Sequence, residues 1–119
     1  MKKILLILIV LLMAFPVSAV EKPEIQLDIS DVGRSFSITV ENHRVKAKEG
    51  IAVNPDAIIT TDFITFVNIF ESSDKQKAAY DAYKQGKVRV QVLASYNTLL
   101  KKGYNKMYQS FVRTHPDLT

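Results

Sequence analysis

Apolar and polar residues alternate with a period of two in four short stretches of this chain. In the second stretch, Phe36, Ile38 and Val40 are separated by small polar residues. Successive side chains of a β-strand point to opposite faces of a sheet, so this alternation predicts strands with one buried face. The four alternating strands are 25–29, 36–40, 45–48 and 88–92, and the β-rich run at 57–60 predicts a fifth strand.

A period near 3.6 residues replaces this alternation after Thr61-Asp62, and it indicates helices. Phe63, Phe66 and Phe70 recur at helical spacing, and either residue of the Thr61-Asp62 pair can cap a helix that begins there. A second helix begins near Asp74 and ends at Gly86, a residue typical of helix C-termini. The two predicted helices are 62–70 and 74–85.

The apolar pattern after Ser95 predicts one long helix. The helical spacing persists for about 18 residues, which corresponds to roughly 27 Å. Gly103 interrupts the run, at a cost of about 1 kcal/mol relative to Ala, and marks a kink or a close contact. The apolar stripe consists of Tyr96, Leu99, Leu100, Tyr104, Met107, Tyr108 and Phe111.

The order of elements predicts the fold class. Four strands are followed by two short helices, one more strand and the long helix. Consecutive strands favour antiparallel pairing, and amphipathic helices must bury their apolar stripe against the sheet. We therefore expect an α+β two-layer sandwich, in which a mainly antiparallel sheet of about five strands carries the helices on one face.

The first residues have the features of an export signal. Lys2 and Lys3 precede the apolar stretch Ile4–Phe15, and the small residues Val17 and Ala19 follow. The apolar stretch is about 18 Å long as a helix, well short of the roughly 30 Å hydrocarbon core of a bilayer. We predict a cleaved signal peptide at 1–19, one exported domain at 20–119 (secreted, periplasmic or on the cell surface), and as the alternative an uncleaved membrane anchor.

Composition narrows the classes of function. The chain contains no Cys, so the predicted domain has neither disulfides nor thiolate chemistry. Of the 16 Lys and Arg residues, Lys2 and Lys3 lie in the predicted signal, which leaves 14 against 12 Asp and Glu. A net charge of +2 gives no reason to expect nucleic-acid binding.

Several segments resemble a known family. They are the hairpin from Ser37 to Gly50, the run from Pro55-Asp56 into the helix after Asp62, and Lys77–Val90 with its Gln85-Gly86-Lys87 turn. Over about 36–108 the chain resembles the sterol carrier protein 2 (SCP2-like) family. This resemblance implies a five-stranded sheet whose helices enclose an apolar tunnel. The helix that usually precedes the family's first strand is replaced here by the predicted export signal.

The residues give little basis for catalysis, and we expect no enzymatic activity. His43 and His115 fall in a predicted turn and in the tail, and there is no Gly-x-Ser-x-Gly or Gly-rich phosphate loop. Asp28 and Asp31 lack further metal ligands at a suitable spacing, so they are interpreted as a strand-end acid and a turn acid. No cofactor and no metal are expected.

The large apolar side chains of the predicted helices are the candidate ligand-binding residues. Tyr has a polar tip on an apolar body, which suits a cavity mouth, and Met adapts to irregular ligands. Ordinary core packing is the alternative for the same side chains. The candidates are Phe63, Phe66, Val67, Phe70, Tyr83, Leu99, Leu100, Tyr104, Met107 and Phe111.

The leading hypothesis is therefore non-catalytic carriage of a lipid, sterol-like or other apolar molecule between sheet and helices. The alternative is an interaction module that docks a partner or a second copy on an exposed sheet face. Arg44, Lys46 and Lys48 share one sheet face by their spacing. They indicate a solvated face or a protected edge, or alternatively a contact with anionic lipid headgroups at a membrane surface.

Overall fold

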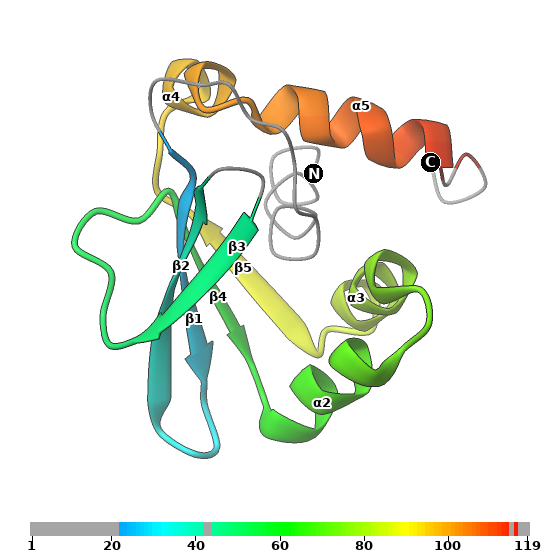
Figure 1. Cartoon of the computed structure of the whole chain (residues 1–119). Coiled ribbons are helices and arrows are strands. Elements are labelled where there is room, and N and C mark those ends of the chain that lie inside the picture. Colours follow the sequence, from blue (N-terminus) through cyan, green and yellow to red (C-terminus); the bar gives the residue numbers. More distant parts are fainter. Residues whose placement is uncertain (1–21, 42–43, 115, 117–119) are drawn as a thin grey trace.

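The computed structural model describes residues 22–41, 44–114 and 116. Five strands form one sheet in the order β3-β2-β1-β4-β5 (Figure 1). All five predicted strands are confirmed, and their ends differ from the prediction by at most two residues. The strands are β1 (Glu24–Ile29), β2 (Arg34–Glu41), β3 (Arg44–Glu49), β4 (Ala57–Thr61) and β5 (Val88–Val92).

The sheet is mixed, with β1 at its centre. Three of the four strand pairings are antiparallel, as expected, whereas β1 and β4 run parallel. Leu27 of β1 lies opposite Phe36 of β2 on one side and Ile59 of β4 on the other. The prediction of a mainly antiparallel sheet holds, but the parallel pair at its centre was not predicted.

One face of the sheet is apolar and the other is polar. Ile25, Leu27 and Ile29 are buried, whereas Gln26 and Asp28 between them are only half-buried. Residues opposite one another on paired strands share a face, so the same division extends across the sheet. Each buried Ile or Leu side chain contributes about 1.5–3 kcal/mol relative to an exposed one.

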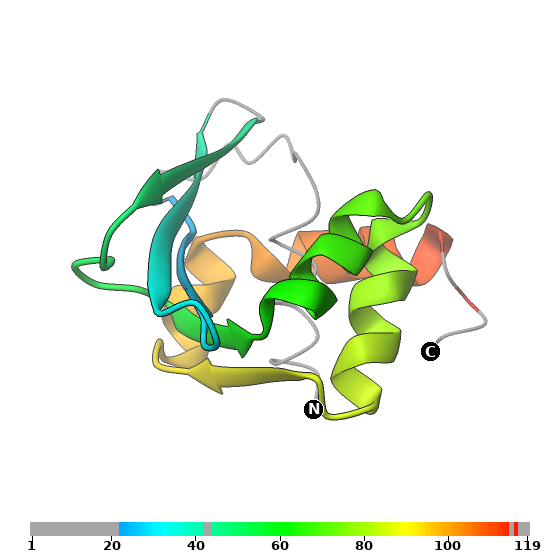
Figure 2. The same cartoon turned by 90° about the horizontal axis from the view of Figure 1, so that it is seen from below.

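The helices are α2 (Phe63–Glu71), α3 (Lys75–Lys84), α4 (Tyr96–Lys101) and α5 (Tyr104–Thr114). Helices α2, α3 and α5 lie on one side of the sheet, whereas α4 lies beyond one end of the strands (Figures 1 and 2). The predicted two-layer α+β arrangement is therefore present in the part of the chain that the structure describes.

Helix α3 ends at Gly86, as its sequence predicts. Gly86 has a φ of 76°, and its N–H donates to the carbonyl of Tyr83 at 3.0 Å. The N–H of Lys87 reaches back to the carbonyl of Ala82 at 2.9 Å. These two bonds form a Schellman motif, which requires a left-handed residue after the helix and so favours glycine.

The prediction of one long C-terminal helix is wrong. Helix α4 ends at Lys101, and Gly103 has a φ of 85° before α5 begins at Tyr104. The N–H of Gly103 donates to the carbonyl of Leu100 at 3.1 Å, so the glycine terminates α4 instead of kinking a continuous helix. The apolar stripe continues through this break, which is why periodicity alone did not reveal it.

The connection from β3 to β4, residues 50–56, lies on the side of the sheet opposite the helices (Figures 1 and 2). Strands β3 and β4 run in the same direction, because both are parallel to β1. The connection must therefore run back from the end of β3 to the start of β4, and it crosses β2 and β1 on the way. Ala52 within it is buried, whereas Ile51 and Val53 on either side are 77% and 98% exposed. The connection therefore rests on the sheet through Ala52.

Some predictions fall outside the described residues. The predicted signal peptide at 1–19 and its cleavage after Ala19 are among them, as are His43 and His115. Within the described ranges, no helix has both the length and the apolar character needed to cross a bilayer.

Candidate ligand-binding site

Helix α2 begins at two carboxylates from different parts of the chain. Asp62 is its N-cap and accepts a hydrogen bond from the N–H of Thr65 at 2.7 Å. Asp31, in the turn between β1 and β2, accepts the N–H of Phe63 at 2.9 Å. Because the first N–H groups of a helix have no partner inside it, both carboxylates satisfy otherwise orphaned donors. Asp31 thereby ties α2 to the β1–β2 turn.

Apolar residues occur on nearly every side of α2, so the helix cannot bury all of them. Phe66 and Phe70 contact each other with ring centroids 4.6 Å apart, and Phe66 packs against the core. Phe63 is 47% exposed, Ile64 is 65% exposed and Phe70 is 52% exposed. This helix therefore presents apolar surface that the described fold leaves uncovered.

A pocket of about 170 Å³ lies between α2, α3 and the residue just before β5. Its apolar part is formed by Ile69, Ala78 and Ala82, and hydroxyl, amide and charged groups surround it. Known pockets for drug-sized ligands occupy about 300–1,000 Å³, so this one is small. Its lining residues are Thr65, Asn68, Ile69, Ala78, Asp81, Ala82, Gln85 and Lys87.

The charges near this pocket are partly balanced. The hydrogen bonds from the backbone and side chain of Thr65 lower the pKa of the Asp62 carboxyl, and the positive charge of Lys87 adds to this effect. Lys87 lines the pocket together with Asp81. The rim therefore offers one cation and one anion to a ligand, and it has no strong overall preference for either charge.

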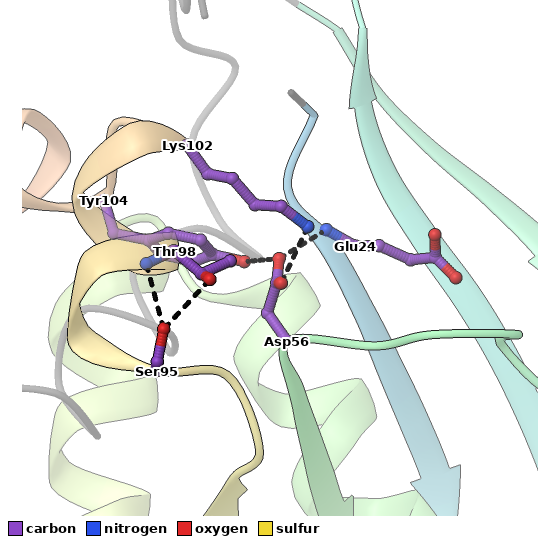
Figure 3. Close-up of polar contacts among 6 residues, drawn as sticks. All are labelled: Glu24, Asp56, Ser95, Thr98, Lys102 and Tyr104. Carbon is purple, nitrogen blue, oxygen red and sulfur yellow. Dashed lines mark hydrogen bonds and ion pairs between the residues drawn. The ribbon is translucent and has the colours of Figure 1, made fainter. Parts of the chain in front are cut away.

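A second polar centre surrounds Asp56, immediately before β4 (Figure 3). Its carboxylate is almost completely buried and accepts three hydrogen bonds. Lys102 Nζ lies 2.7 Å from Oδ1 in an ion pair, while the hydroxyl of Tyr104 and the N–H of Glu24 donate to Oδ2 at 2.7 and 3.0 Å. The main-chain carbonyl of Asp56 also accepts the N–H groups of Leu93 and Ala94.

The Asp56 network is suited to holding structure and not to catalysis. Burial, followed by the negative charge of Asp56, raises the pKa of the Tyr104 hydroxyl far above its ordinary value, so Tyr104 remains a neutral donor. Lys102 and Tyr104 flank the break between α4 and α5, and Glu24 begins β1. One carboxylate thereby joins the beginnings of two strands to the junction of two helices.

The structure separates the predicted ligand-binding residues. Leu99 and Tyr104 are in the core, with 2% and 0% exposure, and Tyr83 packs against it. The expected position of the Tyr104 hydroxyl at a wet cavity mouth is not observed, because Asp56 binds it inside the protein. Leu100 is 39% exposed and Val67 is half-buried. Phe63, Phe66 and Phe70 are described above.

Met107 and Phe111 belong to α5, and their side chains lie outside what the structure describes. None of the other eight candidates lines the pocket between α2 and α3. The residues that line this pocket were not predicted, because most of them are small or polar. The sequence also does not show that this face of α2 packs opposite this face of α3. The sequence indicated Asp56 only as part of the Pro55-Asp56 run and gave no sign of its buried hydrogen bonds.

Asp28 and Asp31, interpreted from the sequence as a strand-end acid and a turn acid, both accept hydrogen bonds within the protein. Asp28 accepts hydrogen bonds from Ser35 Oγ and Gln26 Nε2, at 2.7 and 2.9 Å, and Asp31 caps α2. Among the residues that the structure describes, no three His, Cys, Asp or Glu side chains are grouped as metal ligands. In the same set, every buried side-chain nitrogen or oxygen has a hydrogen-bond partner.

Comparisons with known proteins gave matches only among solved structures, since no family model and no curated protein matches the chain. A ubiquinone synthesis protein named UbiJ-SCP2 is 8% identical, with 74% of this chain and 70% of that one covered and a TM-score of 0.49. Sterol Carrier Protein 2 Like 2 from Aedes aegypti is 14% identical, with 83% and 88% covered and a TM-score of 0.43.

The sec-alkylsulfatase Pisa1 from Pseudomonas sp. is also 14% identical, but this chain covers only 12% of it, with a TM-score of 0.46. Two of these three proteins carry the name of the SCP2 family that the sequence resembles. All three TM-scores lie below 0.5, so neither a ligand nor a reaction is transferred from these proteins to this chain.

Proposed function

We propose that this chain binds and carries an apolar ligand, such as a lipid or sterol-like molecule, without catalysing a reaction on it. The observation that carries the proposal is the uncovered apolar surface of α2, which adjoins a small pocket. Ile64 lies one helical turn before Asn68, a pocket residue, so the exposed surface continues into the pocket. The apolar side chains of the pocket are Ile69, Ala78 and Ala82, and its other five lining residues are polar or charged.

The size of the pocket defines how a ligand would bind. A volume of about 170 Å³ accommodates only one end of a lipid. The remainder would lie along the exposed side chains of α2, or α2 and α3 would separate to admit it. Complete burial of one Ile or Phe side chain contributes about 1.5–3 kcal/mol. Association costs about 4–15 kcal/mol, so weak binding with low selectivity is expected.

The predicted export signal places this activity outside the cytoplasm, and we include that location in the proposal. The mass and N-terminal sequence of the protein from its native host test it. Cleavage after Ala19 supports export, and an uncleaved Met1 in a membrane fraction supports the anchored alternative. Either result leaves the ligand-binding proposal to be judged on its own test.

Titration of the purified chain with a dansyl-labelled fatty acid tests ligand binding. Ala78→Leu places a larger side chain in the pocket, whereas Lys77→Leu introduces the same side chain on the exposed surface of the same helix. We expect Ala78→Leu to weaken binding about tenfold, the scale of an overpacked site. Lys77→Leu should bind like the parent chain. Equal affinities for both variants, or no binding by the parent, would refute the proposal.

The interaction-module alternative places a partner or a second copy on an exposed sheet face. In the described part of the sheet, the apolar face is buried and the opposite face carries polar residues such as Gln26, Ser37 and Thr39. Organic extraction and native mass spectrometry of the chain still separate the two functions. Co-purified lipid on a monomer supports carriage, whereas a ligand-free dimer supports the interaction module.

A further inference from the structure

The side of the sheet opposite the helices combines two projecting aliphatic side chains with a basic edge. Ile51 and Val53, in the connection from β3 to β4, are 77% and 98% exposed. Single exposed apolar residues are common on protein surfaces. These two differ because they project from one short segment, on either side of the buried Ala52.

Lysines lie on the same side of the sheet as this segment. In the β2–β3 register, Lys46 is opposite Thr39 and Lys48 is opposite Ser37. Ser37 is in turn opposite Gln26, which belongs to the polar face of β1. Residues opposite one another share a face, so Lys46 and Lys48 belong to the face away from the helices, and both are exposed.

Acidic groups near this edge already have partners. Glu49, at the end of β3, forms an ion pair with Arg34 at 3.2 Å. Asp28, on the polar face, accepts hydrogen bonds from Ser35 and Gln26. Arg89 of β5 is opposite Thr60 and adds a third exposed cation to the polar face. Among the described residues of the polar face, Lys46, Lys48 and Arg89 are exposed, whereas the acidic Glu24 and Asp28 are half-buried.

We propose that this face docks on anionic lipid bilayers, with Ile51 and Val53 entering the membrane interface and Lys46 and Lys48 beside the lipid headgroups. Burial of apolar side chains together with attraction to anionic lipid is the general basis of peripheral membrane binding. A basic residue near such a surface contributes about 1 kcal/mol. The inference goes beyond ligand carriage and does not depend on it.

The exposed apolar surface of α2 does not offer the same complementarity. Ile64 is 65% exposed, but it lies within the first turn of a helix that begins at Asp31 and Asp62. Two carboxylates would face the negative headgroups there and oppose docking. Because Ile64 also belongs to the proposed ligand surface, the control position is Lys77, which is exposed on α3 and does not line the pocket.

The absence of cysteine from the chain permits a local test in the full-length protein. Val53→Cys or Lys77→Cys is labelled with the environment-sensitive dye NBD and mixed with vesicles of phosphatidylcholine and phosphatidylserine. We expect a blue shift with increased emission at position 53 and none at position 77. A dye at each position reports its own surroundings, whatever the N-terminal residues contribute to binding.

Further substitutions in the labelled Val53→Cys chain test the basis of binding. Lys46→Gln and Lys48→Gln should each weaken the vesicle affinity reported by the dye about fivefold, and added salt should do likewise. Ile51→Ser should weaken it about tenfold. Vesicles of phosphatidylcholine alone should bind less than the mixed vesicles.

Three outcomes would overturn the proposal. They are an unchanged spectrum at position 53, equal shifts at positions 53 and 77, and a shift at 53 that increases with protein concentration without vesicles. The last would identify a second copy of the chain as the occupant of this face. Fatty-acid titration without vesicles is independent of these outcomes, so failure of docking and failure of ligand carriage are distinguishable.

Discussion

Replacing Tyr104 by Phe removes one hydroxyl group from the Asp56 network and leaves the buried ring in place. The hydroxyl donates to Asp56 at 2.7 Å, and Tyr104 has no exposed surface. A hydrogen bond to a charged group contributes about 1.5–3 kcal/mol. Lys102 and the N–H of Glu24 still bind the carboxylate, so we expect a loss near 2 kcal/mol in the free energy of unfolding.

The loss should also depend on pH. Burial, with the negative charge of Asp56, raises the pKa of Tyr104 in the folded protein, whereas in the unfolded chain it is near 10. Above pH 10 the unfolded chain gives up this proton and the folded protein keeps it. The contribution of Tyr104 is therefore fully present below pH 10 and decreases at higher pH. The stability difference between parent and Tyr104→Phe should shrink by up to about 1.4 kcal/mol per pH unit there.

Urea unfolding followed by circular dichroism, at neutral pH and at several values above pH 10, measures both effects. Tyr83→Phe is the matched control, since Tyr83 also packs against the core but belongs to α3 and not to this network. Its stability should stay within about 0.5 kcal/mol of the parent. If Tyr104→Phe is as stable as the control, or if its difference from the parent is constant above pH 10, the account of this network is incorrect.

Two further substitutions test the ends of the helices. Gly86→Ala should lower the free energy of unfolding by about 1–2 kcal/mol, because a residue with a Cβ is strained at a φ of 76° even though the Cβ meets no other atom within 4 Å. Gly86→Asn should cost less, since Asn tolerates this conformation better. Equal stability of the parent and both variants would contradict the Schellman motif. Asp62→Ala should lower the melting temperature while Asp62→Asn should nearly preserve it, since both Asp and Asn cap helices. The pKa of Asp62 is lowered in the folded protein, so its charge stabilises the fold above the pKa that the carboxyl has in the unfolded chain. Any stability advantage of the parent over Asp62→Asn should therefore vanish on acidification. A stability difference that stays constant with pH would refute this role of the charge.

The elements of this fold were predictable where a local pattern determines them. Alternation located four of the strands and β-rich composition the fifth, and Asp62, Asp74 and Ser95 each cap the helix that follows. The parallel pairing of β1 with β4 was not predictable in this way. It depends on residues more than 30 positions apart, such as Leu27 and Ile59, and on a connection that passes two strands. Local periodicity contains no information on such pairing.

The candidate site was less predictable than the fold, because apolar stripes do not reveal what covers them. Leu99 and Phe70 have the same apolar character in the sequence, yet one is 2% and the other 52% exposed. Ala78 and Ala82 lie four residues apart on one face of their helix, and the structure places both beside a pocket. Which stripe is core and which adjoins open space depends on how the helices pack against each other.

The Asp56 network explains how a small domain without disulfides joins segments that are distant in its sequence. Small exported domains often use disulfides for this purpose, and this chain has no cysteine. Asp56 instead joins residues 32, 46 and 48 positions away through Glu24, Lys102 and Tyr104. Removal of one partner from a buried ion pair costs about 3–5 kcal/mol, comparable to the loss of a disulfide.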